Sequence, residues 1–282
     1  MREIKKVLII GAGFTGKQIA ATTALYDYNV NICDINSEIL AEAKKYIDGV
    51  LKRNKKLELI NKVSYYNEIE EAVNDVDLVI EAVPENIGLK KKVFSQIDQI
   101  APMKTIIATN SSSIPVSKIE DAVGRKDKVL NIHFYPPIPR RPMADVMRGT
   151  KTSDKTFDIG IKWIKSIGCY PIILKKECHG FVFNRMWHAA RREALKIWVG
   201  GYADIETIDL AWKTFTGMKM GPFVLMDAIG LDTVYAVQMS YFHESGDFRD
   251  KPPDELKEMV EKGDLGMKSG KGFYTWKKPK KT

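Results

Sequence analysis

The first half of the chain alternates short apolar runs with longer amphipathic runs, in which apolar residues recur every three or four positions. Short runs rich in β-branched residues predict strands, and amphipathic runs predict helices. The predicted strands are 6–10, 29–33, 63–66, 77–82, 105–108 and 128–132, with helices predicted over 16–26 and 37–56. Because Leu78-Val79-Ile80 is continuously apolar, we expect a strand covered on both faces. The alternation is typical of a parallel, doubly wound α/β sheet.

The pattern changes beyond about residue 180, where strand-like runs disappear and helical periodicity dominates. Pro and Gly residues mark the joints between the amphipathic runs. The predicted helices are 181–199, 205–214, 223–228, 231–244 and 253–262. We therefore predict two domains, an α/β domain over 1–180 and an all-α domain over 181–282.

Composition narrows the class of protein. Of the 282 residues, 44% are hydrophobic and 28% are charged, which is typical of a globular protein. No uncharged apolar run approaches twenty residues, and the N-terminus lacks the pattern of a secretory signal, so we expect no membrane partner. Cys33, Cys169 and Cys178 are too few and too scattered for a disulfide framework or a zinc site. We predict no metal and a cytoplasmic location.

The formal net charge of +8 indicates either a solubilising surface or an anionic partner. One basic cluster lies between Lys44 and Lys56 and is not interleaved with the aromatic residues that favour single-stranded nucleic acids. A phosphate-bearing small molecule accounts for this cluster as well as DNA would. We expect a small-molecule substrate and no nucleic acid.

A glycine motif follows the first predicted strand and opens the first predicted helix. Gly11, Gly13 and Gly16 fit G-x-G-x-x-G, which provides a tight turn, close approach to a pyrophosphate and close helix packing. Asp34 ends the second strand, where its carboxylate accepts hydrogen bonds from ribose hydroxyls and repels a 2′-phosphate. A glycine-rich turn without a ligand is the alternative. We predict a bound dinucleotide, with NAD favoured over NADP and FAD as a competitor.

Candidate chemistry lies at the carboxyl ends of the predicted strands. His133, unlike the other three histidines, ends such a strand on the cofactor side, and an imidazole titrates near the pH needed for reversible proton transfer. Asp145 lies on the strand-like run 142–147, and an antiparallel return would bring it beside His133. The alternatives are a structural histidine and a surface aspartate. The serines at 111–113 and Asn184 are further candidates for contact with a substrate. The alternatives are a helix cap for the serines and a cap or a contact at the domain joint for Asn184.

Several segments in this order resemble the L-3-hydroxyacyl-CoA dehydrogenase family, which includes 3-hydroxybutyryl-CoA dehydrogenases. They are Gly11 to Gly16, Glu81 to Asn86, Asn110 to Ser113, His133-Phe134, Gly180 to Arg185, Met220 to Phe223, Gly230 to Asp232 and Lys268 to Tyr274. The resemblance covers nearly the whole chain. It implies a Rossmann-like NAD-binding domain, a helical substrate and dimerisation domain, and a homodimer. It also implies oxidation of a short-chain (S)-3-hydroxyacyl-CoA by NAD, as in β-oxidation of fatty acids.

The resemblance also assigns roles to residues. It implies that His133 is the base and that Asp145 assists it, at a position where the family has glutamate. The other family positions correspond to Ser112 and Asn184 at the substrate oxygen, Glu85 and Lys90 near the nicotinamide, and Asp34 at the ribose.

This chain departs from the family pattern after His133. The family reads His-Phe-Phe-Asn-Pro, whereas here Tyr135 and Pro136 follow Phe134, and Arg140-Arg141 adds two positive charges. These arginines suit an anionic acyl group or a CoA phosphate. Arg53 and Lys56 lie near the family's CoA-contacting positions, where a solvated helix face is the alternative. Two further hypotheses are a dehydrogenase of a free 3-hydroxy acid, of the L-gulonate or carnitine type, and an inactive dinucleotide-binding relative.

Overall fold

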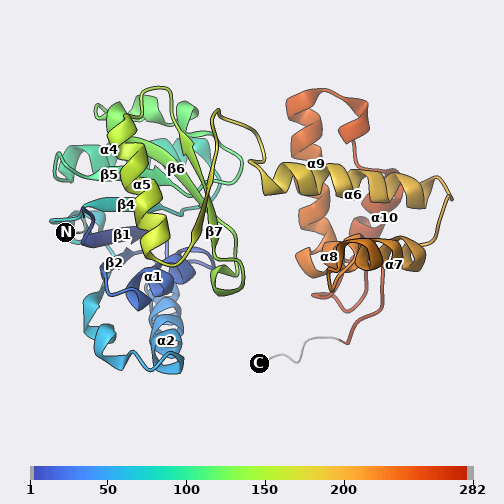
Figure 1. Cartoon of the computed structure of the whole chain (residues 1–282), viewed down its shortest axis with the longest axis horizontal. Coiled ribbons are helices and arrows are strands. Elements are labelled where there is room, and N and C mark those ends of the chain that lie inside the picture. Colours follow the sequence, from blue (N-terminus) through green and yellow to red (C-terminus); the bar gives the residue numbers. More distant parts are fainter. Residues whose placement is uncertain (1–2, 278–282) are drawn as a thin grey trace. The chain divides into compact units, whose positions relative to one another are not determined.

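The computed structural model describes residues 3–277 and divides into two compact units, Met1–Val182 and Phe183–Thr282 (Figure 1). The division lies two residues after the predicted boundary because buried Phe181 clusters with Met147 and Leu174 of the first unit. No helix within residues 3–277 is long and apolar enough to span a membrane.

The first unit is built on an eight-stranded sheet in the order β3-β2-β1-β4-β5-β6-β7-β8. Its strands are β1 (Lys6–Ile10), β2 (Asn29–Cys33), β3 (Val63–Tyr66), β4 (Leu78–Glu81), β5 (Ile106–Thr109), β6 (Val129–Phe134), β7 (Met143–Arg148) and β8 (Tyr170–Ile173). The first six strands are parallel, β7 runs antiparallel to β6, and β8 runs parallel to β7. The strand order reverses between β1 and β4, which is where such sheets bind ligands. The predicted fold class is confirmed.

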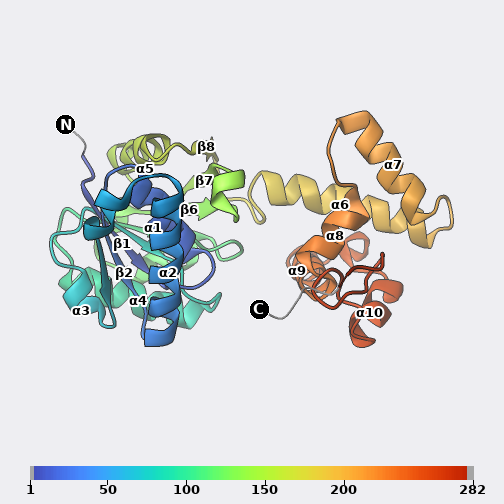
Figure 2. The ribbon, with the colours of Figure 1, turned by 90° about the horizontal axis from the view of Figure 1, so that it is seen from below.

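Helices cover both faces of this sheet (Figure 2). They are α1 (Gly16–Leu25), α2 (Ser37–Arg53), α3 (Ile69–Ala72), α4 (Ile87–Ile100) and α5 (Asp154–Ser166). Short 3-10 helices span Leu57–Lys62, Val116–Lys118, Glu120–Ala122, Lys126–Lys128 and Ile138–Arg140. One core joins the sheet to α1, α2 and α5, and a second joins it to α3 and α4. Burial on both faces explains why the central strands are continuously apolar.

Side-chain caps fix where two of these helices begin. The Asn36 side chain accepts hydrogen bonds from the backbone N–H groups of Glu38 and Ile39 at the start of α2. The Asn86 side chain likewise accepts from the Leu89 N–H, at 2.9 Å, and starts α4 directly after the β4 loop. An N-cap of this kind typically contributes about 1 kcal/mol. The cap on α4 sets the first turn in which Lys90 lies.

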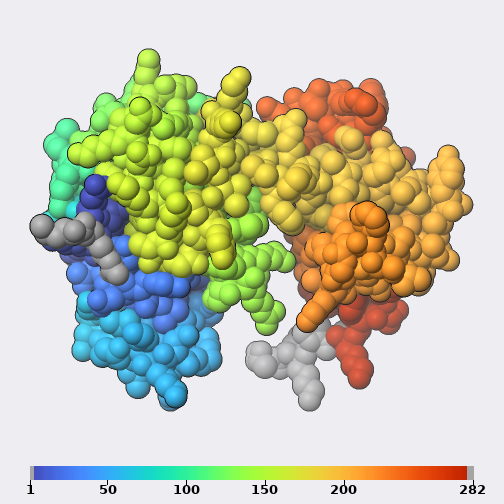
Figure 3. All heavy atoms as spheres, viewed as in Figure 1, coloured from blue at the N-terminus to red at the C-terminus, as the bar shows by residue number. Residues whose placement is uncertain are grey.

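The second unit is helical; Figure 3 draws it and the first unit with all heavy atoms. Its helices are α6 (Phe183–Val199), α7 (Ile205–Thr216), α8 (Pro222–Ile229), α9 (Leu231–Ser245) and α10 (Asp254–Glu261), with a 3-10 helix at Phe248–Asp250. Buried Phe223, Met226 and Leu231 are at the centre of its core. Asp227 is buried and accepts hydrogen bonds from Phe273, Tyr274 and Trp276, which explains how the closing segment is held to α8.

Candidate active site

The glycine turn lies between β1 and α1, at the point where the strand order reverses. Gly11 has φ +97°, and a Cβ there would lie 2.6 Å from the Ala82 carbonyl oxygen. A Cβ on Gly16 would lie closer still to the Gly11 carbonyl oxygen, so both positions exclude any side chain. At Gly13, by contrast, a Cβ would meet no atom within 4 Å. The turn therefore leaves open space at the one glycine where the motif requires a ligand to approach.

These residues fit a dinucleotide. Helix α1 has no side-chain cap at its N-terminus, and the positive end of a helix attracts phosphate. The Asp34 side chain follows β2 and accepts from the Ala12 N–H at 2.8 Å and from the Asn36 N–H at 3.0 Å. Asp34 is thus fixed beside the glycine turn, where the motif places the carboxylate that contacts a ribose.

His133 and Asp145 face one another across the antiparallel pair β6–β7. The two residues are register partners, and His133 Nδ1 lies 3.2 Å from Asp145 Oδ2. Asp145 is fully buried and His133 is 6% exposed. The antiparallel return expected from the sequence is present, and aspartate contacts the imidazole directly although it is one methylene shorter than glutamate.

Two aromatic rings hold the His133 imidazole. Phe181 stacks on it, with ring centroids 4.7 Å apart, and Tyr135 packs edge-on at 4.6 Å. The Tyr135 hydroxyl also donates a hydrogen bond to Asp145 Oδ2 at 2.5 Å. The imidazole is therefore restricted in rotation by the two rings and by the carboxylate.

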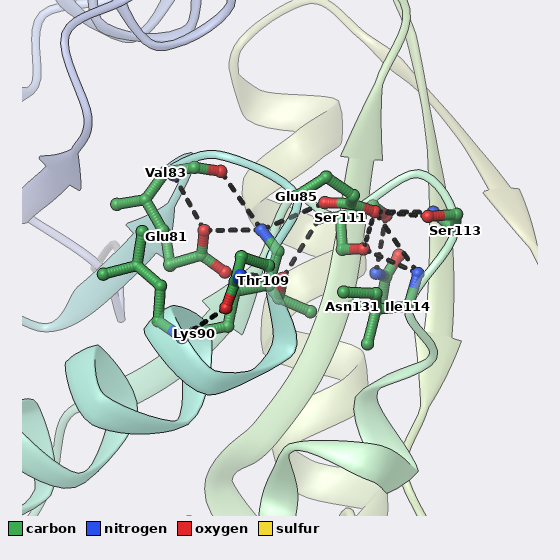
Figure 4. A network of polar contacts seen from close by, with 11 residues as sticks. Glu81, Val83, Glu85, Lys90, Thr109, Ser111, Ser113, Ile114 and Asn131 are labelled. Carbon is green, nitrogen blue, oxygen red and sulfur yellow. Dashed lines mark hydrogen bonds and ion pairs between the residues drawn. The ribbon is translucent and has the colours of Figure 1, made fainter. Parts of the chain in front are cut away.

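An ion-pair network, buried at Lys90 and Glu81, connects the ends of β4 and β5 to the first turn of α4 (Figure 4). Lys90 is 1% exposed, and its Nζ lies 2.8 Å from Glu81 Oε1 and 3.2 Å from Glu85 Oε2. Glu81 is fully buried and also accepts from the Thr109 hydroxyl. Burial raises the pKa of Glu81, and the opposing effects of Lys90 and Thr109 are smaller. Lys90 is thereby fixed between two carboxyl groups.

Glu85 anchors the serine loop that follows β5. Its Oε1 accepts from the Ser111 hydroxyl at 2.5 Å and from the hydroxyl and N–H of Ser113 at 2.7 and 2.9 Å. Burial would raise the pKa of Glu85, but these hydrogen bonds and Lys90 lower it to about 2. The carboxylate is therefore ionised at neutral pH and fixes the loop that carries Ser112.

A pocket of about 290 Å³ gathers these groups at the carboxyl edge of the sheet. It is lined by Thr15, Ala82, Val83, Glu85, Lys90, Asn110, Ser112, His133, Phe134 and Pro136. The structure thus brings together four of the residues singled out from the sequence. The Ser112 side chain is exposed, and the glycine turn contributes Thr15 at the start of α1.

The remaining candidates lie outside this pocket. Arg140 and Arg141 are exposed, and Arg141 donates to the Pro136 carbonyl oxygen at 3.1 Å. Arg53 and Lys56 are exposed near the end of α2, a 17-residue helix. At 1.5 Å per residue, that end lies about 25 Å along the helix from its start beside Asp34. Asn184 is partly buried in the first turn of α6 and belongs to the second unit.

Four residues of the site received no individual role from the sequence: Glu81, Ser111, Tyr135 and Phe181. The sequence does contain a signal for Glu81, because an acid that ends a fully apolar strand must find a buried partner. Tyr135 also had one, since it brings a hydroxyl to a position where the resemblance has phenylalanine. Phe181 has φ +53°, a conformation that a sequence pattern does not reveal.

A glycine turn at the switch point, an acid after β2 and a histidine–carboxylate pair in the adjacent pocket define a dinucleotide-dependent dehydrogenase. Residues 6–178 match the family described as 3-hydroxyacyl-CoA dehydrogenase, NAD binding domain, and residues 180–276 match its C-terminal domain. The chain therefore belongs to the 3-hydroxyacyl-CoA dehydrogenase family. The predicted enzyme class, an NAD-dependent oxidoreductase, and the predicted cofactor, NAD, are confirmed.

Individual relatives match this chain over nearly their whole length. The chain is 34% identical to a probable 3-hydroxybutyryl-CoA dehydrogenase of Bacillus subtilis, covering 97% of this chain and 98% of the relative. It is 33% identical to the mitochondrial hydroxyacyl-coenzyme A dehydrogenase of Rattus norvegicus, covering 97% and 92%. The solved (S)-3-hydroxybutyryl-CoA dehydrogenase of Ralstonia eutropha is 34% identical, with a TM-score of 0.90 over 98% of this chain and all of that chain.

Proposed function

We propose that this chain oxidises a short-chain (S)-3-hydroxyacyl-CoA, such as 3-hydroxybutyryl-CoA, with His133 as the base and Asp145 as its partner. The observation that carries the proposal is the contact between His133 Nδ1 and Asp145 Oδ2 beside an open pocket. The names of the relatives from Bacillus subtilis and Ralstonia eutropha support the choice of acyl group.

The chemistry assigned to His133 follows from which ring nitrogen is free. In the tautomer whose Nδ1–H donates to the Asp145 carboxylate, the imidazole carries its lone pair on Nε2. Within residues 3–277 the ring contacts a carboxylate through Nδ1, and it lines the pocket. Nε2 takes the proton of the substrate's C3 hydroxyl, and Asp145 stabilises the resulting imidazolium.

Other residues of the first unit hold the reactants. Bound NAD supplies the acceptor for the hydride that leaves C3. Gly11, Gly13 and Gly16 would hold its pyrophosphate and Asp34 its ribose, because the turn is open at Gly13 and closed at its neighbours. Glu85 and Lys90 would orient the nicotinamide from the pocket wall.

The carbonyl that forms at C3 needs hydrogen-bond donors. We assign Ser112 to this role, since its hydroxyl is exposed in the pocket on a loop that Glu85 fixes. Asn184 in the helical unit is the second proposed donor. Arg53 and Lys56, on an exposed basic helix end, are the proposed contacts for a CoA phosphate.

We also propose that the helical unit forms a homodimer. Helix α7 and the loop after it carry four large apolar side chains that are exposed in the single chain: Leu210 at 60%, Phe215 at 93%, Met218 at 44% and Met220 at 38%. Such residues commonly mark an interaction surface when they lie together. Light scattering of the purified protein tests this, and a monomer at micromolar concentration would contradict it.

A free 3-hydroxy acid is the second candidate substrate class. Arg140 and Arg141 are exposed, and the hydrogen bond from Arg141 to Pro136 ties this segment to the wall of the pocket. A guanidinium pair suits a carboxylate as well as it suits a phosphate.

One experiment separates these candidates. The purified chain is incubated with NAD and either 3-hydroxyacyl-CoA esters of increasing length or the matching free hydroxy acids, and NADH absorbance is followed. We expect turnover of the (S)-3-hydroxybutyryl ester and little turnover of the free acid. Turnover of the free acids alone would replace the CoA ester by the second class, and NADH binding without any turnover would contradict both.

A further inference from the structure

Tyr135 and His133 contact the same oxygen of one carboxylate. The Tyr135 hydroxyl donates to Asp145 Oδ2 at 2.5 Å, and His133 Nδ1 lies 3.2 Å from that oxygen. All three side chains are buried, with exposed fractions of 6%, 6% and 0% for Tyr135, His133 and Asp145. The hydroxyl is therefore in a position to compete with the imidazole for the carboxylate.

A buried carboxylate depends on such donors to remain ionised. Asp145 Oδ1 has no hydrogen-bond partner within residues 3–277, so Oδ2 receives all the donors that the described side chains provide. Of these, the tyrosine bond is the shorter one. The distance to His133 Nδ1 exceeds the 2.7–2.9 Å that is usual for a charge-assisted bond to a carboxylate.

We propose that Tyr135 is a positioning residue for the oxidation put forward above: its hydroxyl keeps Asp145 ionised and takes up part of the carboxylate's charge, so that His133 releases its proton at a lower pH than it would beside Asp145 alone. The imidazole is then a neutral base over a wider pH range. The part of this inference that concerns catalysis rests on the proposed function. The electrostatic part, which concerns the pKa of His133 alone, does not.

A substitution at Tyr135 replaces none of the other charged or titratable side chains in this region. Glu85 and Lys90 line the same pocket, Cys178 packs with the cluster of Phe181, and Arg141 contacts the Pro136 carbonyl oxygen. Tyr135→Phe removes the hydroxyl and retains the ring that packs edge-on against His133. The variant therefore removes the hydrogen bond to Asp145 while the ring stays in place.

Nuclear magnetic resonance titration of the histidine imidazoles tests the electrostatic half without substrate. The His133 signal is assigned by its absence in His133→Gln. In Tyr135→Phe we expect the His133 pKa to rise by about 0.5 to 1 unit. Asp145 Oδ2 then accepts a hydrogen bond from the imidazole alone, so its negative charge stabilises the protonated imidazole more strongly. Tyr65→Phe is the matched control, since the buried Tyr65 hydroxyl on β3 has no hydrogen-bond partner among residues 3–277. We expect no shift there.

Kinetics test the catalytic half. The acidic limb of kcat/KM against pH should move upward in Tyr135→Phe by the same amount, with KM for the hydroxyacyl-CoA within twofold of wild type. In an Asp145→Asn background, adding Tyr135→Phe should cause no further shift, because the shared carboxylate is gone.

The outcomes are distinguishable. An unchanged or lowered His133 pKa in Tyr135→Phe overturns the inference, and so does an equal shift in the Asp145→Asn background, which would show a direct effect of tyrosine on the ring. If the wild-type chain forms no NADH from any hydroxyacyl substrate, the proposed function fails, and the titration still decides the role of Tyr135.

Discussion

The part of the chain that the structure describes contains two buried histidine–aspartate pairs, one in each unit, and they differ in what surrounds the ring. His133 lies 3.2 Å from Asp145, and His188 lies 3.1 Å from Asp250. The exposed fractions of the two histidines are 6% and 5%. Distance and burial therefore do not distinguish them.

The second ring nitrogen does distinguish them. Arg191 Nη2 donates to His188 Nδ1 at 3.1 Å, and His188 Nε2–H donates to Asp250, so both nitrogens of His188 have partners. Tyr241 stacks on the ring, with centroids 3.8 Å apart. Among the described residues, His133 contacts a side-chain hydrogen-bond partner at Nδ1 alone, and its ring lines a pocket. A histidine–carboxylate contact indicates proton transfer only where the opposite nitrogen faces a space for substrate.

Charged groups surround the His188 ring on several sides. Burial lowers the pKa of His188, and nearby Arg191 and Arg192 lower it further against the raising effect of Asp250. Hydrogen bonds from Ser245, His188 and Arg192 outweigh burial and lower the pKa of Asp250 to about 2. This second pair is a neutral histidine beside a permanent anion, which braces α6 against the segment that follows α9.

The largest expected effect is on activity at the first pair. Asp145→Asn should lower kcat/KM by roughly 10²- to 10⁴-fold, because the amide cannot stabilise an imidazolium. The matched variant Asp250→Asn should stay within about threefold of wild type. The measurement is NADH formation from 3-hydroxybutyryl-CoA, and equal losses in the two variants would abolish the distinction.

The second effect is on stability at the second pair. Asp250→Ala should lower the free energy of unfolding by about 3 to 5 kcal/mol, because it leaves His188, Arg192 and Ser245 without their acceptor. Asp247→Ala, which removes an ion pair to the exposed Arg249, should cost less than about 1 kcal/mol. Urea unfolding of the full chain measures both. A cost below 1 kcal/mol for Asp250→Ala would show that the pair does not brace the unit.

The smallest effect is a pH dependence of stability. The folded pKa of His188 is lowered, so the unfolded chain binds more protons once the pH falls below about 6.5. The stability contribution is therefore intact above that pH and declines as the pH falls toward the folded pKa. His188→Gln should show a shallower decline between pH 7 and 5 in thermal unfolding scans. A decline as steep as that of wild type would assign it to other groups.

The sequence predicted the features that local patterns control. The glycine turn, the strands around it and the antiparallel return that pairs His133 with Asp145 depend on neighbouring residues or on a connection of twelve positions. The contact of Lys90 with Glu81 was not anticipated, because the pairing depends on how the α4 cap orients its first turn over β4. The hydrogen bond from Tyr135 to Asp145 was not anticipated either, because it depends on the path of the backbone after β6.

Helices α4 and α5 and strand β8 were also not predicted as elements. Strand β8 (Tyr170–Ile173) lies at the sheet edge and contains Pro171, and a proline within an apolar run weakens the sequence signal for a strand. The domain boundary depended on Phe181, whose packing against the first unit cannot be read from its place beside Gly180.

The most direct test of the account is the rate of NADH formation from (S)-3-hydroxybutyryl-CoA by His133→Gln, with His188→Gln measured alongside. We expect kcat to fall by roughly 10²- to 10⁴-fold in His133→Gln and to stay within about threefold of wild type in His188→Gln. A His133→Gln chain that turns over as fast as wild type would contradict it.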